Sequence, residues 1–152
     1  MDYRIARLST PEECRQFIIN VEKADPALAD QARRRSIELQ AQHAGGTTEV
    51  EREAYEAVYA YEAVLSKQKG KRVCASRTWQ MIKRHGIIGA VERAVNRPDD
   101  PSGYTALVAI GMEDLSFEAI VLRYPESFSS EAIGRCQVRL TKYKSLGSHV
   151  NA

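Results

Sequence analysis

The chain has 152 residues, of which 43% are hydrophobic and 28% are charged. This length and composition are typical of one soluble globular domain with a sizeable core, so stability requires no disulfide framework and no structural metal. With 22 Lys and Arg against 20 Asp and Glu, the net charge is only +2, which excludes a uniformly basic protein.

The start of the chain and its cysteines favour a cytoplasmic location. The first residues, MDYRIARLSTPEEC, contain no apolar segment of the kind that forms a secretory signal. No apolar run approaches the roughly 20 residues that a membrane-spanning helix needs, so we expect no membrane partner. Cys14, Cys74 and Cys136 are far apart and odd in number, a pattern that favours a reducing compartment.

Helix-start signals divide the first half of the chain into three helices. Residues 1–8 predict a short extended arm or one frayed turn. The three helices are expected over residues 10–23, 25–43 and 48–67. Each begins with a side chain that can accept hydrogen bonds from the first turn, namely Thr10, Asp25 and Thr48. Gly45-Gly46 breaks the chain before the third helix.

The second half predicts a basic loop followed by five shorter helices. The loop covers residues 68–75 and turns at Gly70. The helices are expected over residues 76–85, 87–96, 104–110, 116–123 and 129–143, with Ser76 as a cap, Gly86 as a left-handed stop and a loop at residues 98–103. No alternating strand pattern is longer than a few residues.

These elements predict an all-α fold of about eight helices. We expect one helical domain over residues 1–144 and a flexible tail over residues 145–152. A small N-terminal helical lobe, residues 1–47, is the alternative organisation within that domain.

Positive charge is concentrated in residues 67–97. This stretch holds nine basic residues and one acid, Glu92, and therefore carries +8. The rest of the chain carries −6, because the total is +2. A local positive field of this kind attracts polyanions even where the net charge is near zero. The only tryptophan, Trp79, also lies in this stretch.

The usual signatures of enzymes and cofactor sites are absent from the sequence. His43, His85 and His149 have no metal-ligand spacing to one another or to the cysteines. There is no phosphate-binding glycine loop and no nucleophile elbow. We therefore expect a non-enzymatic protein with no cofactor and no metal. A constellation of residues distant in sequence is the alternative, and Cys74 with His85 in a concave pocket would supply a nucleophile and a base.

Residues 67–84 are the predicted nucleic-acid-binding segment, with DNA favoured. The candidate contact residues are Lys67, Lys69, Lys71, Arg72, Ser76, Arg77, Thr78, Gln80, Lys83 and Arg84. Loop cations would bind phosphates, the first turn of the following helix would add N–H donors, and Arg or Gln would read base edges. The order helix, loop, short helix is helix-turn-helix-like, although the loop is longer than the usual three to four residues.

Other interpretations of the same residues stay open at this point. The basic residues could pair with acids of the 48–67 helix, or dock on an acidic surface of a partner enzyme such as a nuclease. Trp79 is expected in the core rather than as a base-stacking platform. Asp114 is expected to cap the 116–123 helix. The tyrosines between residues 55 and 61 are expected to be half-buried helix contacts, with a homodimer seam as the alternative.

Several short motifs follow one another from residue 81 onward. They are Met81-Ile82-x-x-x-Gly86-x-x-x-Ala90, Gly103-Tyr104-x-x-Leu107, Gly111-x-x-Asp114-Leu115-Ser116-x-Glu118, Ile120-Val121-Leu122, Phe128-Ser129-x-Glu131-Ala132 and Arg139-Leu140. Over about residues 76–140, the chain resembles a small helical bacterial module of unassigned function, found alone or beside restriction-type nucleases. The resemblance implies an all-helical fold and work near DNA. It implies no catalytic residue, because the matched positions are mostly glycines, leucines and helix caps.

Overall fold

The protein is all-helical over the residues that the structure describes. The computed structural model describes the backbone of residues 2–97 and 102–150. The eight α-helices are α1 (Tyr3–Ala6), α2 (Pro11–Val21), α3 (Pro26–Gln42), α4 (Glu49–Lys69), α5 (Ser76–Val95), α6 (Ser102–Ala109), α7 (Phe117–Arg123) and α8 (Ser130–Val150). Two short 3-10 helices, Glu113–Leu115 and Pro125–Ser127, flank α7. The described ranges contain no strand, so the all-α prediction of about eight helices is confirmed.

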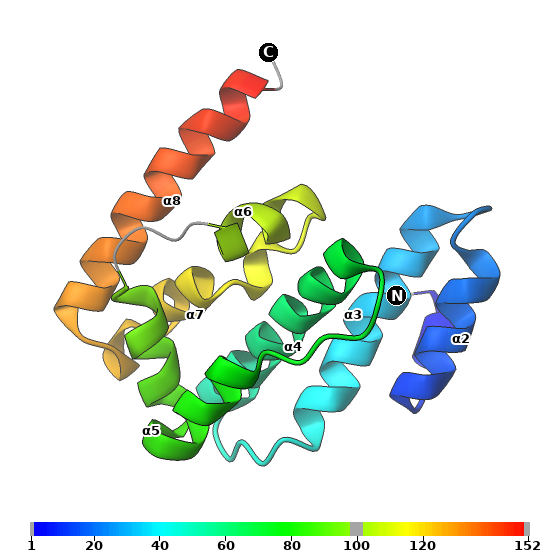
Figure 1. Ribbon diagram of the computed structural model, residues 1–152, viewed down its shortest axis with the longest axis horizontal. Helices are drawn as coiled ribbons and strands as arrows, with labels where there is room; N and C mark the ends of the chain where they lie inside the picture. The colour runs from blue at the N-terminus through cyan, green and yellow to red at the C-terminus, as the bar shows by residue number, and fades with distance from the viewer. Residues whose placement is uncertain (1, 98–101, 151–152) are drawn as a thin grey trace.

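Helix α4 lies at the centre of the molecule. Figure 1 shows α2 and α3 on one side of it, and α5, α7 and α8 on the other. Small residues let neighbouring helices approach α4 closely: Ala54 and Ala57 belong to a core cluster with α5, α7 and α8, and Ala60 to a second cluster with α3 and α6. α4 therefore fixes where the segments before and after it lie.

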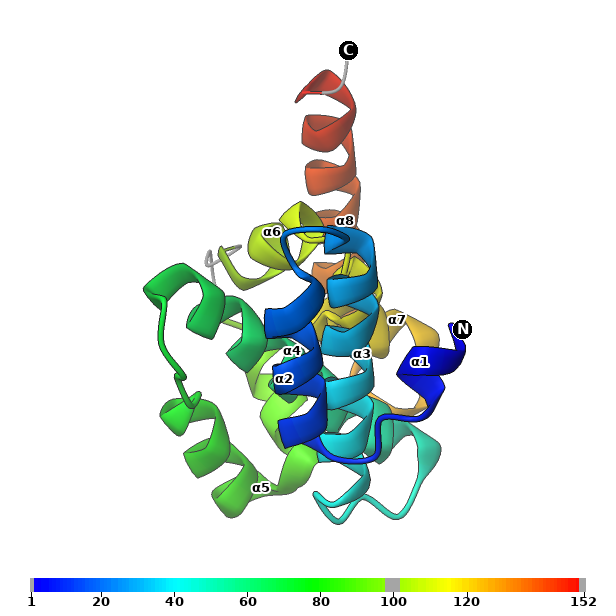
Figure 2. The same cartoon turned by 90° about the vertical axis from the view of Figure 1, so that its right-hand side faces the viewer.

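The first three helices have a hydrophobic cluster of their own. Ile5 of α1 and Leu28 and Ala32 of α3 are buried there, and partly buried side chains of α2 pack against them. Figure 2 shows α2 and α3 side by side, with α1 next to α3. Ile37 of α3 belongs instead to the cluster that α3 shares with α4. Residues 1–47 thus contact the rest of the chain mainly through α3.

The predicted helix starts of the first half are confirmed by their hydrogen bonds. The Thr10 hydroxyl accepts from the Glu13 amide at 3.1 Å, the Asp25 carboxylate from the Leu28 amide at 3.1 Å, and the Thr48 hydroxyl from the Glu51 amide at 3.2 Å. Each bond satisfies one N–H group that has no acceptor within its own helix.

Several predicted helix ends and caps were wrong. Ala75, whose side chain cannot cap, occupies the N-cap of α5, so Ser76 is already the first helical residue. Ser116 caps α7 by accepting from the Ala119 amide at 3.1 Å, whereas Asp114 binds Arg34 instead. α6 begins at Ser102, inside the predicted 98–103 loop, most of which lies outside the described residues.

The last helix is longer than the sequence indicated. A helix end was predicted near residue 143, with a tail from residue 145. The backbone of α8 instead remains helical to Val150. In Figure 1 this end of α8 projects beyond the other helices. The terminal sequence contains no proline after Pro125 and a single glycine, Gly147, after Gly134. A single glycine weakens a helix without ending it, so the helical backbone can continue.

Gly86 divides α5 into two helical segments, as the sequence predicts. Its backbone has φ 76° and ψ 169°, whereas the flanking residues are helical. This region of backbone conformation is open almost only to glycine, because it brings a β-carbon into conflict with the adjacent peptide groups. The first segment, residues 76–85, carries the candidate contact residues, and the second carries the buried Ile87, Val91 and Val95.

We expect Gly86→Ala to lower the free energy of unfolding by about 1–3 kcal/mol. An added β-carbon would meet nothing within 4 Å, so the whole effect would come from the backbone conformation. Gly134→Ala is the matched control: its site in α8 is equally open, and its helical backbone suits alanine, so a gain of up to about 1 kcal/mol is expected. Urea denaturation measures both. A Gly86→Ala variant as stable as wild type would contradict the kink.

Candidate nucleic-acid interface

Side chains of α4 hold the loop between α4 and α5. Gly70, with φ 67°, ends α4, and the loop covers residues 70–75. The Ser66 hydroxyl accepts from the Val73 amide at 2.9 Å. The Glu62 carboxylate accepts from the Ala75 amide at 2.8 Å. These bonds attach both the middle of the loop and the start of α5 to α4.

Trp79 is half-buried and packs against the core, in line with the prediction. Its indole N–H donates to the same Glu62 oxygen at 2.8 Å. Its ring lies 6.2 Å from that of Tyr55, nearly parallel, and 5.4 Å from that of Tyr59. Burial also raises the pKa of Tyr59 above its ordinary value. The prediction of half-buried tyrosine contacts is confirmed, since Tyr55, Tyr59 and Tyr61 are all half-buried.

The first segment of α5 places most of its candidate residues on one solvent-facing side. The exposed members are Ser76, Arg77, Gln80, Lys83 and Arg84. At about 100° per residue, these five positions fall within an arc of about 120°. Thr78 lies on the other side of the helix: it is half-buried and lines a hollow with Met81 and Tyr104. The structure therefore does not bring Thr78 together with the other candidates.

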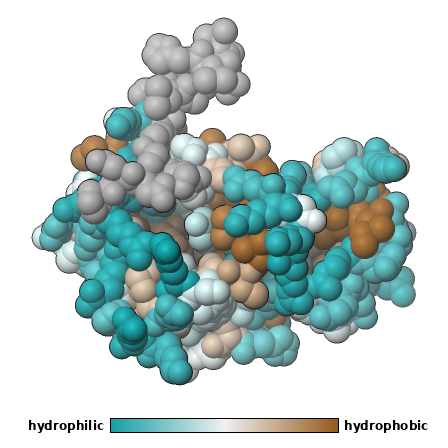
Figure 3. All heavy atoms as spheres, in the orientation of Figure 1, coloured by the Kyte–Doolittle hydropathy of each residue, from teal (hydrophilic) through white to brown (hydrophobic). Residues whose placement is uncertain are grey.

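The remaining candidate residues lie at the end of α4 and in the loop. Lys67, Lys69, Lys71 and Arg72 are all exposed. On the face shown in Figure 3, hydrophilic side chains gather over the end of α4 with its loop, and over α5. Lys67 and Arg72 also line hollows between this region and α2 and α3.

Among the described residues, the seven cations of residues 67–84 differ from most arginines of other segments in forming no ion pair. None of the carboxylates in the described part of the chain lies within ion-pair distance of them. The ion pairs found there use arginines of other segments, namely Arg4, Arg33, Arg34, Arg35, Arg123, Arg135 and Arg139. Arg34, for example, binds both carboxylate oxygens of Asp114 at 2.9 Å and lowers the pKa of that group.

Three acids of α4, namely Glu51, Glu53 and Glu62, are used in other contacts. Glu51 accepts from the hydroxyls of Thr47 and Thr48, and Glu53 binds Arg123 and the Tyr124 hydroxyl. Glu62 holds the loop and Trp79 as described above. The alternative in which the basic segment pairs with the acids of α4 therefore finds no ion pair among the described residues.

The geometry that would support a Cys–His pair is not found between Cys74 and His85. Cys74 is exposed and lines a hollow to which His85 does not contribute. Cys74 lies in the loop before α5, and His85 lies at the far end of the first α5 segment, which is about 15 Å long. Cys14 and Cys136 are buried, and burial raises the pKa of Cys136 to about 12, which disfavours the reactive thiolate.

Metal-ligating side chains do not gather in the part of the chain that the structure describes. Within it, no group of His, Cys, Asp and Glu side chains has the arrangement of a metal site. None of the helices described there combines the length and apolarity needed to cross a membrane.

Comparisons of the chain with protein-family models, with curated proteins and with solved structures gave no match. The resemblance of residues 76–140 to a helical module thus stays an expectation from the sequence.

Proposed function

We propose that this chain binds nucleic acid, with DNA as the favoured form, through the exposed cations of residues 67–84. One observation carries the proposal: seven exposed cations in 18 consecutive residues have no carboxylate within ion-pair distance among the described residues, while seven arginines of other segments are paired. Unpaired surface cations keep their attraction for an external polyanion, because no internal anion neutralises them.

The two parts of the segment have different roles in this proposal. The loop cations Lys69, Lys71 and Arg72 bind phosphates, which fixes position without reading sequence. The exposed side of α5 offers Arg77 and Gln80, whose side chains match the donor and acceptor edges of bases in a major groove. The bonds from Glu62 and Ser66 support the proposal, because they hold loop and helix together before any ligand binds.

Gel-shift titrations with duplex DNA, single-stranded DNA and RNA of equal length test the proposal. We expect a complex with at least one of them, tightest with duplex DNA, that weakens as salt rises. Failure to shift any of the three at about 50 mM salt, where electrostatic binding is strong, would remove the proposal.

The rival is an adaptor that docks the same cations on an acidic surface of a partner enzyme. The same unpaired charges favour it, since an acidic protein surface is also a polyanion. A pull-down that recovers a protein in stoichiometric amount and no nucleic acid would favour this rival over DNA binding.

A further inference from the structure

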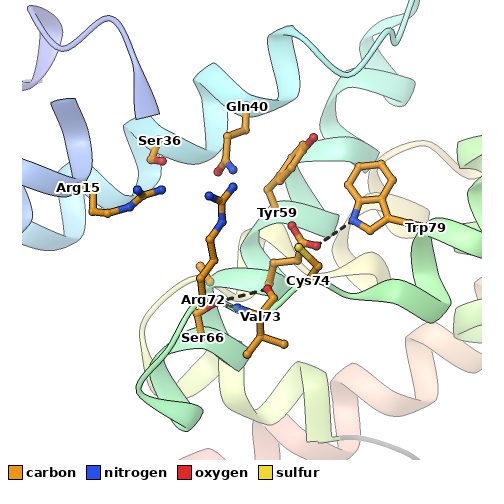
Figure 4. A pocket seen from close by; sticks show the side chains of 11 residues that line it. Arg15, Ser36, Gln40, Tyr59, Ser66, Arg72, Val73, Cys74 and Trp79 are labelled. Atoms are coloured by element: carbon orange, nitrogen blue, oxygen red, sulfur yellow. Dashed lines mark hydrogen bonds between the residues drawn. The ribbon is translucent and has the colours of Figure 1, made fainter. Parts of the chain in front are cut away.

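A hollow with two arginines lies beside the proposed interface. Its volume is about 510 Å³, and it is formed by α2, α3, α4 and the loop at residues 70–75. Figure 4 shows its polar residues: Arg15 of α2 enters from the left and Arg72 of the loop rises from below, and both guanidinium groups end below Ser36 and Gln40 of α3.

The charges in this hollow are not balanced. Among the described residues, no carboxylate lies within ion-pair distance of Arg15 or Arg72. Glu62 is the single acid lining the hollow, and its bound oxygen already accepts from the Ala75 amide and the Trp79 indole, on the Trp79 side. With two arginines against one acid, the lining keeps a surplus of positive charge, which a bound anion would neutralise.

The donors of the hollow suit a tetrahedral dianion. Each guanidinium offers a planar pair of N–H donors that matches two oxygens of a phosphate. The Ser36 hydroxyl and the Gln40 amide add neutral donors on the α3 wall above the two arginines in this view. A carboxylate, with one charge and two oxygens, would occupy a single arginine. We propose that this hollow binds a phosphate monoester group.

There is room for the group that carries the phosphate. A second hollow of about 510 Å³ shares Arg15, Ser36 and Gln40 with the first and continues along α3 and α4. It is lined in part by the apolar Ile18 and Ile37 and by Lys67. A phosphate bound between Arg15 and Arg72 therefore leaves its ester substituent in the second hollow. The same phosphate chemistry belongs to a small metabolite and to the end of a nucleic-acid strand.

Substituting Arg15 tests this site independently of the proposed nucleic-acid interface, because Arg15 belongs to α2 and lies outside residues 67–84. The first experiment is an NMR titration with inorganic phosphate, AMP, adenosine and acetate. We expect phosphate and AMP to shift the amides of the hollow, and adenosine and acetate to have no comparable effect. Arg15→Gln and Arg72→Gln should each weaken AMP binding by about tenfold to a hundredfold. Arg93→Gln, an exposed arginine of α5, should leave it unchanged.

A second arm identifies the source of the phosphate. A 5′-phosphorylated oligonucleotide that binds more tightly than its 5′-hydroxyl form, with the preference lost in Arg15→Gln, would indicate a strand end. AMP binding without that preference would indicate a small molecule. Duplex affinity should stay within about threefold of wild type in Arg15→Gln, because Arg15 is not one of the phosphate-contacting cations of residues 67–84. Two results would overturn the proposed phosphate site, whatever the result for DNA. One is that Arg93→Gln weakens AMP binding as much as Arg15→Gln does. The other is that neither inorganic phosphate nor AMP shifts the amide signals of the hollow.

Discussion

Replacing Lys69, Lys71 and Arg72 together by glutamate is expected to lower the affinity for nucleic acid by about 10²–10³-fold at about 0.1 M salt. Each phosphate contact on duplex DNA contributes about 0.9 to the slope of log K against log salt. At about 0.1 M salt, one contact is therefore worth about 0.9 log units of affinity. The three lost contacts should also flatten the slope by about 2.7. Because phosphate contacts carry no sequence information, the loss should be equal on all sequences.

A charge-matched variant separates a local effect from a change in net charge. Arg7, Lys23 and Arg52 are exposed, lie outside residues 67–84 and form none of the ion pairs found among the described residues. Changing all three to glutamate alters the net charge by the same amount. This control should lose much less affinity in fluorescence anisotropy titrations. Unchanged binding in the loop variant, or equal loss in both, would remove residues 69–72 from the interface.

Trp79→Ala is expected to lower the free energy of unfolding by about 3–5 kcal/mol. The substitution removes the ring that packs against Tyr55, Tyr59 and the largest core cluster. It also removes the indole N–H that donates to Glu62, so the partly buried carboxylate keeps only the Ala75 amide. Urea denaturation followed by circular dichroism measures the loss.

Trp79→Phe is the matched control for this prediction. This substitution keeps an aromatic ring but loses the hydrogen bond to Glu62. We expect it to lower the free energy of unfolding by about 1–2 kcal/mol. If Trp79 instead stacked on bases, Trp79→Ala would abolish binding to single-stranded DNA and leave the free energy of unfolding almost unchanged. That pair of results would contradict the role of Trp79 in the core.

Local signals in the sequence predicted the helices well. Thr10, Asp25 and Thr48 each begin a helix, because a capping bond joins residues only three apart and can be recognised from the local pattern. Gly86 was predicted for the same reason, since its left-handed conformation depends on one residue. The end of α8 was missed, because no comparable local signal marks where that helix ends.

Contacts between residues far apart in the chain could not be predicted. Arg34 and Asp114 are 80 residues apart, and the sequence offered Asp114 only a local role as a cap. Glu62 was considered only as one of the acids of the 48–67 helix that could pair with the basic residues, whereas it joins α4 to Ala75 and Trp79. Arg15 was missed as a functional residue, because only the packing of α2 and α3 beside the loop brings it toward Arg72.

The exposure of the candidate residues was predicted in part. The helical period along the first segment of α5 places Arg77, Lys83 and Arg84 on the side away from the core, and the structure has all three exposed. Thr78 was grouped with them because it is adjacent in sequence, but a step of about 100° turns it toward Met81 and Tyr104.

The salt dependence of wild-type binding to duplex DNA tests the central claim most directly. If several of the seven cations of residues 67–84 contact phosphates, log K should fall linearly with log salt. The slope should lie between about −3 and −6, at about 0.9 per contact. A slope near zero, or no binding at about 50 mM salt, would contradict the claim that these unpaired cations form a nucleic-acid interface.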